Sequence, residues 1–116
     1  MNKQFTNKFS KEWIAAWNSH DLDKIMHHYS DDFEMHSPVI REITGEKNGT
    51  LKGKTAIRDY WKKALDVNPG LHFELMHSFS GTNSIVIQYK GHRGLSAEVF
   101  IFNRENKVIS AFAHYE

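Results

Sequence analysis

The chain has 116 residues, which is enough to bury a hydrophobic core as one domain without help from metals or disulfides. Lys and Arg total 15 against 14 Asp and Glu, so no strongly basic surface points to nucleic acid as a partner. Cysteine is absent, which excludes thiol catalysis, disulfides and thiolate metal sites. No apolar run has membrane-spanning length or forms a signal-peptide core, so we expect one domain over residues 1–116, in the cytoplasm and without a membrane partner.

Aromatic residues recur every four positions near the N-terminus, at Phe5, Phe9, Trp13 and Trp17. This spacing predicts a long amphipathic helix with a broad aromatic face. The sequence Asn18-Ser19-His20 is unfavourable in a helix interior, so the helix is expected to end there.

A second, short helix is predicted directly after this corner. Asp21 can accept hydrogen bonds from the free N–H groups at the start of that helix. Leu22, Ile25, Met26 and Tyr29 then share one apolar stripe. Two helices joined by so short a corner must pack against a shared surface, which the later strands supply.

The next segment alternates apolar and polar residues from Phe33 to Ser37 and stops at Pro38, which predicts a short first strand. Asp31-Asp32 is expected at the turn into this strand. Residues Val39–Gly53 carry Asn48-Gly49 among charged residues, and we expect either a long loop or a small hairpin that turns there.

Apolar positions between Ala56 and Leu65 predict a third amphipathic helix, which Asn68-Pro69-Gly70 ends. Four strands separated by turn sequences are predicted to follow, at Leu71–Phe79, Ser84–Lys90, Leu95–Asn103 and Lys107–Tyr115. Helices followed by an antiparallel meander predict an α+β fold.

The strand Leu95–Asn103 has two apolar faces, with Ala97 and Val99 on one and Phe100 and Phe102 on the other. In the last strand, Ile109, Ala111, Ala113 and Tyr115 are expected on one face and Val108 and Phe112 on the other. An antiparallel sheet with one solvated face should instead alternate cleanly between apolar and polar residues. The helices can cover one face, so we expect a second subunit on the other and predict a homodimer through the sheet.

Several segments resemble the nuclear transport factor 2-like superfamily, in particular its SnoaL-like and ketosteroid-isomerase-like members. The similar stretches lie between Phe5 and Tyr115 and are Ala16-Trp17-Asn18, Asp21-Leu22-Asp23, Tyr29–Phe33 with Pro38, Leu51–Arg58, Val99–Asn103 and Lys107–Ile109. The resemblance implies three N-terminal helices packed in the concave face of a curved, mostly antiparallel sheet, a cystatin-like cone with an apolar pocket at its open end. The superfamily includes isomerases, cyclases, hydrolases, dehydratases and non-catalytic binding modules, so the fold does not determine the activity.

The resemblance to ketosteroid isomerases places Trp13 where those enzymes have a catalytic tyrosine and Ser37 where they have a proton-shuttling carboxylate. An indole supplies only an N–H donor, and a serine hydroxyl is not a competent base without help. Steroid isomerisation by that route is therefore not expected.

Glu98 falls on the third such position, and the similarity to SnoaL-type cyclases implies an acid–base role for it. It shares a strand face with Phe100 and Phe102, and a carboxyl among aromatic walls should have a raised pKa. The alternative is a solvated carboxylate paired with Arg93 or Lys90.

The predicted pocket takes its lining from the helices, the first strand and the last two strands. Its predicted substrate-binding residues are Trp13, Trp17, Tyr29, Ser37, Trp61, Phe100, Phe102, Ala111 and Ala113. Aromatic residues at helical spacing, Tyr60 included, can equally be plain core.

The eight histidines show no metal-ligand spacing, so neither a metal nor a cofactor is expected. His36 is a candidate for the pocket mouth, although its strand phase opposes that position. The predicted function is to bind a small apolar or amphipathic molecule, with catalytic Glu98 as the proton carrier of an isomerase, cyclase or hydrolase. The alternative is a binding module without turnover.

Overall fold

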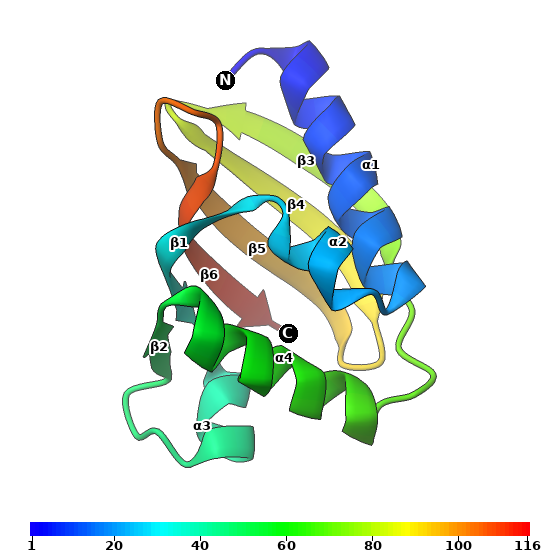
Figure 1. Cartoon of the computed structure of the whole chain (residues 1–116). Coiled ribbons are helices and arrows are strands. Elements are labelled where there is room, and N and C mark those ends of the chain that lie inside the picture. Colours follow the sequence, from blue (N-terminus) through cyan, green and yellow to red (C-terminus); the bar gives the residue numbers. More distant parts are fainter.

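The computed structural model describes residues 1–116 and contains four helices and one six-stranded sheet (Figure 1). The elements in chain order are α1 (Lys3–Ser19), α2 (Leu22–Met26), β1 (Tyr29–His36), α3 (Pro38–Thr44), β2 (Thr50–Lys52), α4 (Lys54–Val67), β3 (Glu74–Gly81), β4 (Ser84–Gly91), β5 (Gly94–Phe102) and β6 (Val108–Tyr115). The strand order is β2-β1-β6-β5-β4-β3, and only β1 and β6 pair in parallel. The predicted α+β fold is confirmed, with four helices in place of three.

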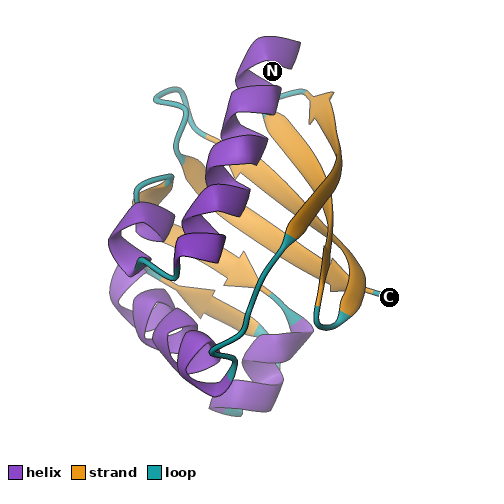
Figure 2. Cartoon of the chain, turned by 90° about the vertical axis from the view of Figure 1, so that its right-hand side faces the viewer, coloured by secondary structure: helices purple, strands orange, loops and turns teal.

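The sheet is curved, and α1, α2 and α4 lie against its concave face (Figure 2). Polar contacts fix α1 across the sheet at both of its ends. Thr6 Oγ1 lies 2.7 Å from Ser80 Oγ on β3. Near the other end, the Asn18 amide donates to the Phe73 carbonyl at 2.9 Å and accepts from the Phe73 N–H at 2.7 Å. None of the helices is long and apolar enough to cross a bilayer.

The corner between α1 and α2 forms as the sequence predicts. The first helix ends at Ser19, and His20 adopts a left-handed conformation with φ 60°. Asp21 Oδ1 accepts hydrogen bonds from the N–H groups of Asp23 and Lys24 at 3.0 and 3.3 Å. These bonds satisfy two donors that the start of a helix leaves free.

The prediction that Tyr29 continues α2 is wrong, because the helix ends at Met26 and Tyr29 begins β1. The long-range pairing of Tyr29 with Val108 of β6 overrides the local helical spacing. The first strand is therefore longer than predicted. Asp31 and Asp32 are exposed within it, where its pairing with β6 is interrupted, and they do not form the predicted turn.

The prediction for Val39–Gly53 is also wrong in its first half, which forms the helix α3. The Ser37 hydroxyl accepts from the Val39 N–H at 3.1 Å, and Pro38 occupies the first turn, where a missing N–H is tolerated. Gly49 lies in the turn before β2 with φ 66°, and a Cβ there would stand 2.9 Å from the Ser37 carbonyl oxygen. This close approach requires glycine.

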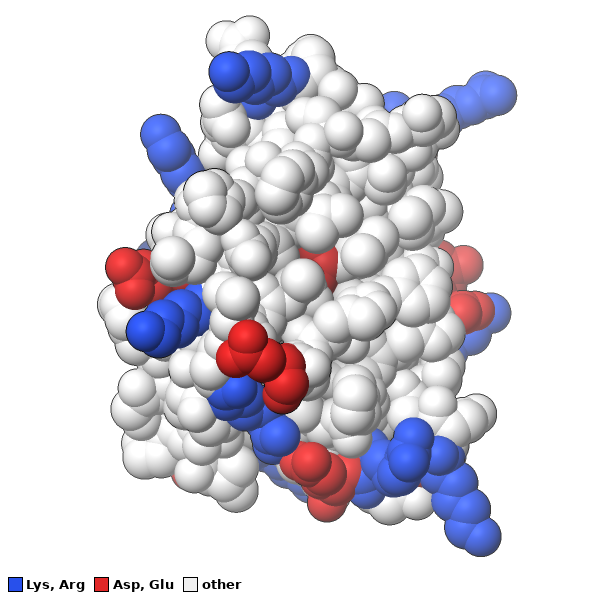
Figure 3. Space-filling view, turned by 180° about the vertical axis from the view of Figure 1, so that it is seen from behind, with Lys and Arg blue, Asp and Glu red and all other residues white.

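The convex face of the sheet carries an apolar row that no helix covers. Cross-strand pairing aligns Phe79, Val86, Val99, Phe112 and His36 along this row. Two of its members are strongly exposed, Phe79 at 56% and Phe112 at 36%. Figure 3 shows this face, with charged residues mainly around its margins.

The sixth strand has a bulge that the sequence did not predict. Ile101 pairs with Ser110 but Phe102 pairs with Val108, so one residue of β6 is unmatched. Val108 consequently points into the core and Ile109 is exposed, the reverse of the uniform alternation expected from the sequence.

Candidate functional site

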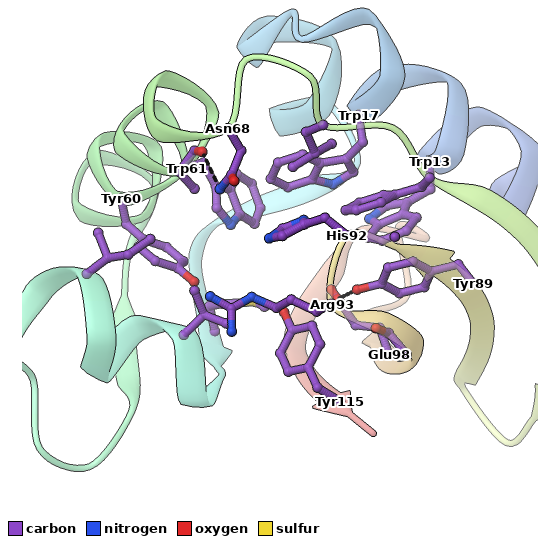
Figure 4. A pocket seen from close by; sticks show the side chains of 18 residues that line it. Trp13, Trp17, Tyr60, Trp61, Asn68, Tyr89, His92, Arg93, Glu98 and Tyr115 are labelled. Carbon is purple, nitrogen blue, oxygen red and sulfur yellow. Dashed lines mark hydrogen bonds between the residues drawn. The ribbon is translucent and has the colours of Figure 1, made fainter.

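A cavity opens on the concave side of the sheet, between α1, α3, α4 and the turn from β4 to β5 (Figure 4). Its volume is about 670 Å³, a figure that includes the opening to solvent. Most of its walls are apolar, and the aromatic ones come from Trp13, Trp17, Tyr60, Trp61, Phe73, Tyr89 and Tyr115. Such a site suits a ligand with a flat apolar body.

Glu98 lies in the wall of this cavity with its side chain on the concave face of β5. It is only 4% exposed, and its cross-strand partners are Ile87 and Ala113. Its one hydrogen bond is long: the Tyr89 hydroxyl donates to Glu98 Oε1 at 3.5 Å. Burial raises the pKa of Glu98 to about 8, and the hydrogen bond from Tyr89 opposes this only in part. Glu98 is therefore mostly a neutral carboxylic acid at pH 7.

Four tyrosines share this buried interior with Glu98: Tyr29, Tyr60, Tyr89 and Tyr115. Burial raises the pKa of each, and the nearby Glu98 carboxylate raises it further. All four hydroxyls therefore remain protonated at neutral pH. They can donate hydrogen bonds but cannot serve as bases.

The two α1 tryptophans in the cavity wall differ in their hydrogen bonding. Trp13 Nε1 donates to the Tyr29 hydroxyl at 3.0 Å. Trp17 Nε1 is buried and has no hydrogen-bond partner. A buried N–H without a partner is uncommon, because leaving it unsatisfied costs about 1–3 kcal/mol.

An ion pair between Arg93 and Glu42 joins the β4–β5 turn to α3 at the mouth of the cavity. Arg93 Nη2 donates to Glu42 Oε2 at 2.7 Å, and Nη1 lies 3.5 Å from Oε1. The guanidinium also lies over the Tyr115 ring, 5.6 Å from its centroid. The hydrogen bond to Glu42 raises the pKa of Arg93, so this side chain is always charged.

Four of the ten predicted site residues line the cavity: Glu98, Trp13, Trp17 and Trp61. The predicted lining residues that instead belong to the packed core are Tyr29, Phe100, Phe102, Ala111 and Ala113. The physical reason is the placement of α1. Its Phe9 ring lies 5.1 Å from Phe100 and 5.0 Å from Phe102, which fills the cone at that end.

Ser37 and His36 also lie outside the cavity wall. The Ser37 hydroxyl caps α3, and hydrogen bonding to it opposes the rise in the pKa of Tyr60 and Tyr115. His36 is on the convex face, where its ring stacks 4.3 Å from that of Phe112. The strand phase that argued against a pocket position for His36 is confirmed.

Several residues line the cavity although the sequence did not predict them there. Two of them, Tyr89 and Tyr115, pair with Ser96, which shares the face of Glu98. The pairing of these strands, had it been worked out from the turn positions, would have placed Tyr89 and Tyr115 beside Glu98. His92 and Arg93 lie in a tight turn, and no periodicity indicates where turn side chains point.

A curved, mostly antiparallel sheet wrapped around helices is the architecture of the cystatin-like fold. A SnoaL-like domain matches residues 10–114, and the chain belongs to this family. It is similar to a SnoaL-like protein of unknown function from Burkholderia thailandensis E264, with 47% identity, a TM-score of 0.96 and coverage of 99% of this chain and 97% of the other.

Two further solved structures show the same fold at low identity. One is SalBIII, an epoxide hydrolase/cyclase-like enzyme of pyran ring formation in salinomycin, with 16% identity, a TM-score of 0.75 and coverage of 99% and 93%. The other is a protein of unknown function with a cystatin-like fold from Methylobium petroleophilum PM1, with 16% identity, a TM-score of 0.76 and coverage of 99% and 78%. A comparison with curated proteins found no match.

Proposed function

We propose that this protein binds a small apolar or amphipathic molecule in the aromatic cavity and that Glu98 transfers a proton on it. The observation that carries the proposal is the isolation of Glu98. It is buried among apolar side chains with a single 3.5 Å hydrogen bond and no cationic partner. A carboxyl in this setting destabilises the fold, and perturbed acids in cavities are typical of acid–base sites.

With a pKa of about 8, Glu98 can both accept and return a proton near neutral pH. The ionised fraction of Glu98 can remove a proton from a carbon next to a carbonyl, whose oxygen receives the electron pair. The resulting acid can return the proton to the same carbon or another one. SalBIII, an epoxide hydrolase/cyclase-like enzyme on this fold, supports a reaction of the isomerase, cyclase or hydrolase kind.

Hydrogen–deuterium exchange tests proton transfer without knowledge of the natural substrate. In heavy water, wild-type protein should accelerate exchange of the α-protons of tetralone, a small aromatic ketone, as followed by proton NMR. Glu98→Gln should abolish the acceleration, and Glu34→Gln, which changes a partly exposed acid on β1 outside the cavity wall, should retain it. No acceleration by wild type, or equal acceleration by Glu98→Gln, would contradict the catalytic role.

The second candidate is a binding module without turnover. It is favoured because Trp13 and Ser37 supply no base and all four buried tyrosines stay protonated. Under this alternative the cavity binds its ligand, and tetralone exchange stays at the background rate in every variant.

We also propose that a second copy of the chain covers the convex face. The apolar row is close to symmetric, with Phe79 and Phe112 flanking the central pair Val86 and Val99. A two-fold axis between Val86 and Val99 would place Phe79 of one copy against Phe112 of the other. Sedimentation at micromolar concentration should show twice 13.5 kDa for wild type and Lys8→Glu, and 13.5 kDa for Val99→Glu. A wild-type monomer contradicts the proposal.

A further inference from the structure

The polar groups of the cavity lie at separate places in its wall, and their positions indicate which chemical groups a ligand would carry. Glu98 lies in the wall formed by β5, Trp17 presents its Nε1 from α1, and Arg93 extends over the opening from the β4–β5 turn (Figure 4). Arg93 is the only Lys or Arg among the lining residues. The remaining walls are largely apolar, so a negatively charged group of a ligand would be stabilised near Arg93.

We propose that the ligand is a small aromatic anion whose negative group pairs with Arg93 and whose second acceptor atom, such as a carbonyl oxygen, accepts the hydrogen bond of Trp17 Nε1. This inference rests on the proposed function, because it assumes that the cavity is a ligand site. It adds the chemical class of the ligand and two residues that select it.

Trp17 Nε1 supports the inference independently of Arg93. Its N–H is buried in the cavity wall without a partner, although Trp13, one turn earlier, has one in Tyr29. A ligand oxygen in the cavity would remove the energetic penalty of this free donor. Catalysis also benefits, because a donor at the carbonyl oxygen stabilises the negative charge that forms there when Glu98 removes a proton.

Glu42 occupies the position that the ligand anion would take on Arg93. Its side chain is 55% exposed and the pair lies at the cavity mouth, so Glu42 can turn into solvent without being buried unpaired. Such exposed pairs contribute little to stability and exchange partners readily. The ligand anion therefore competes with Glu42, and removing the charge of Glu42 should strengthen anion binding.

A matched pair of fluorescent probes separates charge from shape. Anilinonaphthalene sulfonate is an aromatic anion, and N-phenylnaphthylamine is the same ring system without the sulfonate. Wild-type protein should bind the sulfonate about tenfold more tightly than the neutral probe, the size of effect that one partly desolvated charge pair gives. Arg93→Gln should remove this preference and leave the affinity for the neutral probe within about twofold of wild type.

Three variants control the experiment. Glu42→Gln should tighten binding of the sulfonate about threefold, and Arg104→Gln, an exposed arginine in the β5–β6 turn, should change neither probe. Ala64→Phe fills the cavity from α4 and should abolish binding of both probes. Binding that persists in Ala64→Phe would place the probes outside the cavity and overturn the inference.

The remaining outcomes distinguish this inference from the proposed function. If both probes bind equally in wild type and Arg93→Gln, the ligand class is wrong while the cavity remains a binding site. If neither probe binds, the cavity is not a ligand site and both proposals fall. NMR of the indole N–H groups, assigned with Trp17→Phe, should show the Trp17 proton moving downfield with 6-acetyl-2-naphthoate, an aromatic anion that also carries a ketone oxygen, and not with 2-naphthoate, which lacks that oxygen. An unmoved Trp17 signal would overturn its assigned role.

Discussion

The two ends of the cone interior are built from similar residues but have opposite character. At the closed end, Phe5 and Phe9 of α1 pack edge-on against Phe102, with ring centroids 5.7 and 5.0 Å apart. The hydroxyl of Ser10, buried beside them, donates to the Thr6 carbonyl at 2.7 Å. At the open end, Trp17 Nε1 has no partner and Glu98 has only one long hydrogen bond.

This difference separates residues that hold the fold together from residues that weaken it. The closed end gains free energy from burial of apolar rings without leaving a polar atom unsatisfied. The open end buries a carboxyl and a free N–H, both of which oppose folding. Buried polar groups that destabilise the fold are expected at functional sites, where a bound ligand can provide the missing hydrogen-bond or charge partner.

Phe100→Ala should have the largest effect, because it removes a fully buried ring from the closed end. The free energy of unfolding should fall by about 4 kcal/mol, typical of a Phe→Ala change that leaves a cavity. Urea denaturation measures this loss. Phe79→Ala at the exposed convex face is the control and should lose about 1 kcal/mol or less at monomer concentrations. Equal losses in the two variants would contradict the assignment of Phe100 to the packed hydrophobic core.

Glu98→Gln should have the next largest effect, and its size should depend on pH. The folded pKa of about 8 exceeds the ordinary pKa of a glutamate, 4.5, so the folded state binds the proton more tightly. The stability that comes with this proton is complete below pH 4.5 and is lost as the pH rises towards 8. Between pH 5 and 7.5 wild type should lose roughly 3 kcal/mol that Glu98→Gln does not lose.

Thermal unfolding of both proteins across this range measures the difference. The midpoint of Glu98→Gln minus that of wild type should increase from pH 5 to pH 7.5, since other titrating groups contribute equally to both. A constant difference would mean that Glu98 titrates as a solvated side chain. The open end of the cone would then contain no buried carboxyl that destabilises the fold.

The sequence predicted the elements that rest on strong periodic patterns. The aromatic repeat of α1, the Asp21 cap and the concave phase of Glu98 all follow from spacing and capping chemistry. It could not separate the two ends of the cone. Phe100 and Glu98 share one face of β5. The position at which α1 crosses the sheet buries Phe100 under Phe9 and leaves Glu98 in the cavity wall.

The wrong predictions for Tyr29 and for β6 have one physical cause, which is that long-range strand pairing overrides the local sequence pattern. Tyr29 fits a helical stripe, yet pairing with β6 draws it into a strand. The bulge at Ile109 reverses the side-chain phase within β6, and no residue near it is a glycine that would mark it. The α3 segment did carry a usable signal, because Ser37-Pro38 is a favourable helix start followed by Val39 and Ile40.

The smallest effect concerns the two tryptophans of α1, which lie at the boundary between the ends of the cone. Both are nearly fully buried, so Trp13→Phe and Trp17→Phe remove similar apolar area. Trp13→Phe also deprives the buried Tyr29 hydroxyl of its donor at 3.0 Å, whereas Trp17→Phe removes an N–H that has no partner. Trp13→Phe should therefore lose about 1 kcal/mol more in urea denaturation. Adding Tyr29→Phe should shrink this excess, since it removes the orphaned hydroxyl as well. A larger loss in Trp17→Phe would mean that its indole N–H is satisfied inside the protein, and the cavity would no longer offer a free donor to a ligand.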